Sequence, residues 1–206
     1  MTPHTLGYVL HVGHVLSPKN SRHTGSVIPA GLPGAGTRET ELTTPVAFTA
    51  ADELRRLGFF ALHFPGEIAL VLPRPRVDLA DALNAAEVWR GNSGLKHVVF
   101  LSLHYDNPDA NVLKEHGGVH VAADSPSQGP ALTVAGELVQ SCPDVPLHLR
   151  FDTGEMWPVG PTPKAVSRIY LNLGDIKSQT YPAGARNMPA VGKWLGRALA
   201  EATKWV

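Results

Sequence analysis

The clearest pattern in the chain is a pair of short apolar runs that each end in a histidine. Residues 98–103 are apolar except for one serine and end at His104. Residues 6–12 have the same form, interrupted only by His11, and they lead through Gly13 into His14. Runs of this length without regular polar alternation are typical of strands that are covered on both faces, as in the middle of an α/β sheet. Periodicity does not fully separate a buried strand from a buried helix, but we read both as strands.

The remaining segments alternate between patterns typical of helices and patterns typical of strands. Apolar residues three and four positions apart predict helices, the first beginning close to Pro45 and stopping at Gly58, and the others at 78–90, 130–140 and 188–205. Short apolar segments predict further strands at 59–63, 67–72, 116–122, 145–151 and 166–173. This alternation predicts one α/β domain over residues 1–206, with a largely parallel or mixed sheet of about six strands and helices on both faces. Trp194 and Trp205 fall on the apolar face of the last helix, so we expect both in the core.

Composition narrows the class of protein. The chain has 206 residues, of which 43% are hydrophobic and 17% charged, as expected for a globular protein with a sizeable core. Lys and Arg together number 18, as do Asp and Glu, so the formal net charge is zero and no basic excess suggests a nucleic-acid binder. The single cysteine, Cys142, excludes an internal disulfide and any structural zinc site built from two cysteines.

The first residues lack the basic segment and apolar run of a secretory signal, and no apolar run is long enough to span a membrane. We therefore expect a protein made in the cytoplasm, and we expect a monomer.

The two histidines fall where chemistry is often found. In open α/β sheets ligands bind at the carboxyl ends of the strands, and both His14 and His104 follow a predicted strand. Neutral imidazole is the commonest metal ligand, and hydrolytic zinc sites use three protein ligands and a water. The alternative is that each histidine caps its strand by bonding to backbone, and for either stretch alone this is the simpler interpretation.

Glu39 is the candidate for a third ligand. It follows the long polar segment 17–36, which we expect to border the site, and it stands at or just before the first helix. Taken alone, Glu39 is more simply interpreted as an ordinary first-turn acid that the helix dipole favours.

Three motifs, in this order, resemble the zinc-dependent N-acetylmuramoyl-L-alanine amidases of the type 3 cell-wall family. The first is Gly13-His14 at the end of a strand, and the second is the segment Gly34-Ala35-Gly36 leading to Glu39. The third is Ser102-Leu103-His104-Tyr105-Asp106, in which Asp106 stands at the place of an asparagine. Each motif is weak alone, but their order and spacing extend across nearly the whole chain.

The resemblance implies that His14, Glu39 and His104 bind one zinc ion. Zinc lowers the pKa of a bound water toward ~7 and polarises an amide carbonyl. The implied substrate is peptidoglycan, and the bond cleaved joins the lactyl group of muramic acid to the L-alanine of the stem peptide. Tyr105 within the third motif and Asn107 just after it are candidates for contact with substrate, although a packed aromatic is an equal alternative for Tyr105.

One position departs from the family pattern. The family carries a catalytic glutamate at the end of a late strand, before x-Gly, and Leu173-Gly174 places Asn172 there. An amide cannot act as a general base. Asp175, just past the strand, is one substitute for the base, and a carboxylate of the preceding loop, Glu155 or Asp152, is another. The third possibility is a protein that binds zinc and muropeptide with slow turnover or none.

Two functions of different kinds therefore follow from the sequence. The first is a zinc-dependent peptidoglycan amidase, an endolysin or autolysin that acts at the cell wall once released. The second is a catalytically impaired zinc-containing domain that binds cell-wall fragments or regulates a partner. A weaker third option is another zinc amidohydrolase or carboxypeptidase acting on a small peptide.

Overall fold

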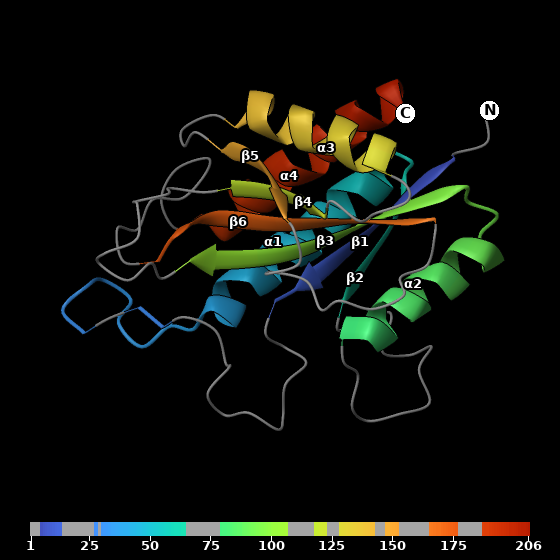
Figure 1. The fold of residues 1–206 in the computed structure, drawn as a ribbon. Coiled ribbons are helices and arrows are strands. Elements are labelled where there is room, and N and C mark those ends of the chain that lie inside the picture. Colours follow the sequence, from blue (N-terminus) through green and yellow to red (C-terminus); the bar gives the residue numbers. More distant parts are fainter. Residues whose placement is uncertain are drawn as a thin grey trace.

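The computed structural model of the protein describes residues 5–13, 27–28, 30–64, 79–106, 118–122, 128–142, 147–152, 165–176 and 187–206. Its centre is a six-stranded sheet with the order β2-β1-β3-β6-β4-β5 (Figure 1). The strands are β1 (Leu6–Val12), β2 (Phe60–Phe64), β3 (His97–Asp106), β4 (Gly118–Ala122), β5 (His148–Asp152) and β6 (Val166–Asp175). The pairing of β4 with β6 is antiparallel and the other pairings are parallel. The predicted mixed sheet of about six strands is confirmed.

Helices cover both faces of the sheet, as predicted. The helices are α1 (Glu39–Arg56), α2 (Leu79–Asn92), α3 (Gln128–Ser141) and α4 (Met188–Ala202), and α4 continues into a short 3-10 helix, η2 (Thr203–Trp205). In Figure 1, α1, α3 and α4 lie on one side of the sheet and α2 lies on the other. Alternation along the buried strands divides the core accordingly, because successive side chains point to opposite faces. Leu101 and Leu103 of β3 belong to the cluster with α1, α3 and α4, whereas Val98 and Phe100 belong to the cluster with α2.

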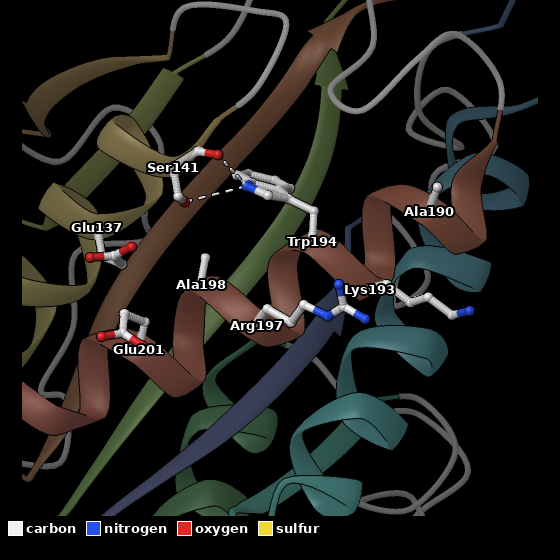
Figure 2. A pocket seen from close by; sticks show the side chains of 8 residues that line it. All are labelled: Glu137, Ser141, Ala190, Lys193, Trp194, Arg197, Ala198 and Glu201. Atoms are coloured by element: carbon white, nitrogen blue, oxygen red, sulfur yellow. Dashed lines mark hydrogen bonds between the residues drawn. The ribbon is translucent and has the colours of Figure 1, made fainter.

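The contact between α1 and α4 depends on two glycines of α4. A β-carbon on Gly192 would lie 2.8 Å from the Val46 carbonyl oxygen, and one on Gly196 would lie 2.9 Å from the Ala50 carbonyl oxygen. The absence of side chains at these positions lets the two helix backbones approach closely. α4 in turn holds α3, since Trp194 Nε1 donates to the backbone oxygen of Ser141 at 2.9 Å (Figure 2).

The first helix starts earlier than predicted. It begins at Glu39 and includes Pro45, which we expected near its start. The backbone N–H of Arg38 donates to Glu41 Oε2 at 3.2 Å, so an interaction of the capping-box kind starts the helix a turn and a half before the proline. The hydroxyls of Thr43 and Thr44 bond to the carbonyls of Glu39 and Thr40, one turn earlier, and the helix continues through Pro45.

The prediction for Trp205 was wrong. Its side chain is 73% exposed, because the regular α-helix ends at Ala202 and the 3-10 turn no longer follows the period that places the apolar face. Trp194 is partly buried against the core, as expected. The predicted strand at 67–72 lies outside the described residues. None of the helices that the structure describes is long and apolar enough to cross a membrane.

Candidate active site at the carboxyl ends of β1, β3 and β6

Polar side chains gather where three neighbouring strands end, on the face of the sheet that α2 covers. The parallel register pairs His11 of β1 with Ser102 of β3, and it pairs Ser102 and His104 of β3 with Tyr170 and Asn172 of β6. These residues follow the same alternation as Val98 and Phe100, which pack toward α2. A row of polar side chains therefore crosses the carboxyl ends of β1, β3 and β6.

Glu39 and His104 meet at this edge although 65 positions separate them. His104 Nδ1 donates to Glu39 Oε1 at 2.9 Å. The same oxygen accepts the backbone N–H of Tyr105 at 3.1 Å, which orients the carboxylate. Both side chains are buried, with 1% of Glu39 and 7% of His104 exposed. Glu39 is the first residue of α1, where the positive end of the helix dipole favours a carboxylate.

The other ring nitrogen of His104 is also held. His104 Nε2 lies 2.9 Å from Ser102 Oγ, and Ser102 Oγ lies 2.9 Å from His11 Nδ1. The His11 ring packs against two phenylalanines, with centroids 5.4 Å from Phe64 and 5.2 Å from Phe100. A continuous hydrogen-bonded series thus joins His11 to Glu39 through Ser102 and His104.

Two further contacts fix the plane of the His104 ring. Tyr170 stacks on it, with ring centroids 4.1 Å apart and planes 13° from parallel. Gly13, whose N–H donates to Leu103 O at 3.0 Å, lies on the β1 side. A β-carbon on Gly13 would stand 2.2 Å from His104 Cε1, so this glycine is required for the imidazole to occupy its place. The side chain of His104 is therefore contacted from β1, β6 and α1.

Asn172 bonds within its own strand. The pairing of β3 with β6 shifts by one residue after His104 and Asn172, so that Asp106 pairs with Asp175. In this bulge Asn172 Oδ1 accepts the backbone N–H of Gly174 at 3.1 Å, an i to i+2 bond that asparagine forms readily. Gly174 has a φ of 148°, which favours glycine. The Asn172 side chain thus supports the bulge at the end of β6.

The structure places some of the predicted site residues and leaves others untested. Glu39 and His104 come together, whereas His14, Asn107 and Glu155 lie outside the described residues. The backbones of Asp152 and Asp175 end β5 and β6, but their side chains are outside the described set.

The prediction of a substrate contact for Tyr105 was wrong. Its side chain is 1% exposed and its hydroxyl donates to Met188 Sδ at 3.2 Å. Tyr105 and His104 are consecutive in β3, so they point to opposite faces of the sheet. That alternation places the Tyr105 ring in the core beneath α4, away from the polar row.

A groove of about 510 Å³ lies elsewhere on the molecule, between α3 and α4. Glu137 and Ser141 of α3 face residues of α4 that include Trp194, Arg197 and Glu201 (Figure 2). None of the predicted metal ligands or catalytic residues lines this groove, so we treat it as separate from the site at the strand ends.

The donor set at the strand ends suits zinc. Among the residues that the structure describes, no three His, Cys, Asp or Glu side chains gather as a metal site, and His14, the third predicted ligand, is outside them. His104 Nδ1 and Glu39 Oε1 are nevertheless chemically appropriate and face each other at 2.9 Å. Two ligands of a tetrahedral zinc ion with bonds of about 2.1 Å lie roughly 3.4 Å apart, so these atoms need separate by only about half an ångström. Gly13, the residue before His14, already touches the His104 ring position.

Solved structures of known proteins share the architecture of this chain. No family model matches the sequence, and no curated protein shows a significant match. The structure resembles N-acetylmuramyl-L-alanine amidase Ami1 from Mycobacterium smegmatis, with a TM-score of 0.60 and 13% identity over 97% of this chain and 98% of that one. The chain has the fold of these amidases. AmiC2 of Nostoc punctiforme (TM-score 0.58, 15% identity, 95% of this chain and 96% of that chain) shares the amidase fold. The catalytic domain of CwlV from Bacillus (Paenibacillus) polymyxa also shares it (TM-score 0.57, 11% identity, 97% of each chain).

Sequence reasoning missed the part played by Tyr170, and it did not identify Ser102 as a bridge. Tyr170 reaches His104 through the register of β3 with β6, which pairs residues 68 or 69 positions apart. Ser102 was part of the recognised motif, and its spacing two residues before His104 on one strand was the available signal, because alternate residues share a face.

Proposed function

We propose that the protein is a zinc-dependent N-acetylmuramoyl-L-alanine amidase that cleaves the bond between muramic acid and L-alanine in peptidoglycan. The observation that carries this proposal is the meeting of Glu39 and His104, buried at the carboxyl edge of the sheet with 2.9 Å between Oε1 and Nδ1. It is supported by the amidase fold and by the sequence Gly13-His14 at the end of β1. In this proposal His14, Glu39 and His104 hold one zinc ion.

A bound zinc ion would supply Lewis acidity toward the amide carbonyl and activate water for attack. The chain's own residues prepare that position. The Tyr105 N–H keeps Glu39 Oε1 directed at His104, and the Tyr170 ring and the Ser102 hydroxyl hold the imidazole in one orientation. Preorganised ligands of this kind raise metal affinity because they need not be ordered when the metal binds.

The second candidate function is a zinc-containing domain that binds muropeptide with little turnover, and Asn172 is the observation that favours it. Its amide cannot take a proton from water, and its Oδ1 already accepts the Gly174 N–H. In the amidase proposal the base is supplied by another carboxylate, and the candidates remain Asp175, Glu155 and Asp152. We further propose that the protein works as a monomer at the cell wall, as an endolysin or autolysin.

The test measures zinc content and the release of stem peptide from purified peptidoglycan, for the wild type and for His104→Ala and Glu39→Gln. His148→Ala is the matched control, because His148 is an exposed histidine on β5, at the far edge of the sheet. We expect about one zinc per chain and cleavage in the wild type and the control, and loss of both in the two site variants. Zinc without cleavage in the wild type would favour the binding domain, and a wild type without zinc would refute the metal site.

A further inference from the structure

His11 has no part in the function proposed above, yet it ends the hydrogen-bonded series that contains a predicted ligand. The series runs from His11 Nδ1 to Ser102 Oγ, from Ser102 Oγ to His104 Nε2, and from His104 Nδ1 to Glu39 Oε1, each at 2.9 Å. All four side chains are buried, with between 1% and 7% of each exposed. In such surroundings the direction of every hydrogen bond has to agree with the next one.

The direction of the series is set at Ser102. A hydroxyl has one proton, so Ser102 donates to one imidazole and accepts from the other. When His104 Nδ1 carries the proton and donates to Glu39, Nε2 of the neutral ring carries no proton and is an acceptor. Ser102 then donates to His104, and His11 Nδ1 must carry a proton that it donates to Ser102.

The direction reverses when a cation takes the place of the proton between His104 Nδ1 and Glu39. The proton of the His104 ring is then on Nε2 and is donated to Ser102 Oγ. Ser102 donates to His11 Nδ1, which must now be an acceptor, so the His11 proton is on Nε2. One proton leaves His104 Nδ1 and one is taken up at His11 Nε2, and both rings are neutral before and after.

We propose that His11 is a positioning residue for His104, acting through Ser102, and that its ring changes tautomer when His104 Nδ1 binds zinc. This inference rests on the proposed metal site. Imidazole suits the position because Nδ1 can either donate or accept, whereas a carboxylate can only accept and a lysine can only donate. The packing of the ring against Phe64 and Phe100 keeps Nδ1 aimed at Ser102 in both states.

The tautomer is measured directly by long-range ¹H–¹⁵N correlation spectra of protein labelled with ¹⁵N-histidine, in the zinc-free form and after one equivalent of zinc. We expect His11 to carry its proton on Nδ1 without zinc and on Nε2 with zinc. Competition with a chromogenic chelator gives the zinc Kd in parallel. In Ser102→Ala the His11 tautomer should no longer depend on zinc, and the Kd should rise about 10- to 100-fold.

Substitutions at His11 separate hydrogen bonding from packing. His11→Phe keeps an aromatic ring between the two phenylalanines and removes the hydrogen bond, so the zinc Kd should rise as it does in Ser102→Ala. His11→Asn, whose amide can donate or accept near the Nδ1 position, should restore most of the affinity. Ser167→Ala is the matched control, because Ser167 is a fully buried serine on β6 that lies outside this series, and it should leave the Kd unchanged.

The outcomes separate this inference from the proposed function. A His11 tautomer that is the same with and without bound zinc would overturn the inference and leave the metal site intact. A change of tautomer on zinc binding, in a protein that releases no stem peptide, would support the inference and refute the amidase. Zinc affinities of His11→Phe and Ser102→Ala equal to that of the wild type would overturn the positioning role. A wild type that takes up no zinc would overturn both proposals.

Discussion

Gly13 and the His104 imidazole occupy adjoining space at the end of β1, so closely that a β-carbon on Gly13 would stand 2.2 Å from His104 Cε1 and 2.5 Å from Nδ1. A β-carbon does not approach a ring atom of another residue to less than about 3 Å, so any side chain at position 13 must displace the ring or the strand. Glycine is needed here because of this close approach between a strand end and a side chain.

Gly13→Ala should therefore move His104 away from Glu39 and weaken zinc binding by at least about 10-fold, as loss of ligand orientation generally does. Chelator competition measures the effect. Gly136→Ala is the control, because a β-carbon on Gly136 of α3 would meet no atom within 4 Å. Equal zinc affinity in Gly13→Ala and the wild type would show that the ring position is not needed for metal binding.

Asn172 offers a test of the missing base. Asn172→Asp keeps an oxygen that can accept the Gly174 N–H and adds a carboxylate two positions before it. A positioned general base accelerates proton transfer by about 10²–10⁴-fold, so we expect stem-peptide release to become at least about tenfold faster. Asn172→Ala, which removes the hydrogen bond and adds no base, should show no gain. A rate in Asn172→Asp no higher than that of the zinc-loaded wild type would place the reacting water elsewhere.

The close contact between α1 and α4 predicts that a substitution far from the strand ends can also lower the stability of the fold strongly. A β-carbon on Gly196 would lie 2.9 Å from both Ala50 O and Glu53 Cβ, so Gly196→Ala should overpack the helix pair and lower the free energy of unfolding by about 1–3 kcal/mol. Urea denaturation measures this change. Gly136→Ala should instead be neutral or stabilising by up to about 1 kcal/mol, since it replaces glycine inside a helix with space around it. Equal stability of the two variants would contradict the described packing.

Glu53 links α1 to α4 and makes stability depend on acid pH. Hydrogen bonds from Arg56 and then from Arg197 lower the pKa of Glu53 from its ordinary 4.5 to about 2. Because the folded pKa is the lower one, the unfolded chain binds the proton first as pH falls. The stabilisation is therefore complete above about pH 4.5 and is lost as the pH falls toward 2. The free energy of unfolding of the wild type should fall more steeply across this pH range than that of Glu53→Gln. Parallel plots of the free energy of unfolding against pH would refute the role of the two arginines.

Much of the fold, and the placement of Glu39 and His104 at one edge of the sheet, could be predicted from the sequence because both depend on local patterns. Apolar runs ending in a histidine located β1 and β3, and the order of the motifs identified Glu39 as the partner of His104. The start of α1 was misplaced because Pro45 is a strong local signal that the interaction of Arg38 with Glu41 overrides.

Contacts between side chains of different strands could not be predicted from the sequence. Tyr105 was expected at the site because it follows His104, but the alternation of β3 places it in the core against Met188. The stacking of Tyr170 on His104 depends on the register of two strands far apart in the chain. Such contacts follow from strand register, which no single segment specifies.

The most direct test of the metal site is anomalous diffraction at the zinc absorption edge from crystals of the zinc-loaded protein. We predict one strong peak within about 2.2 Å of His104 Nδ1 and of a Glu39 carboxylate oxygen, with a nitrogen of His14 as the third protein ligand. A zinc peak bound elsewhere, with Glu39 and His104 still bonded to each other at 2.9 Å, would contradict it.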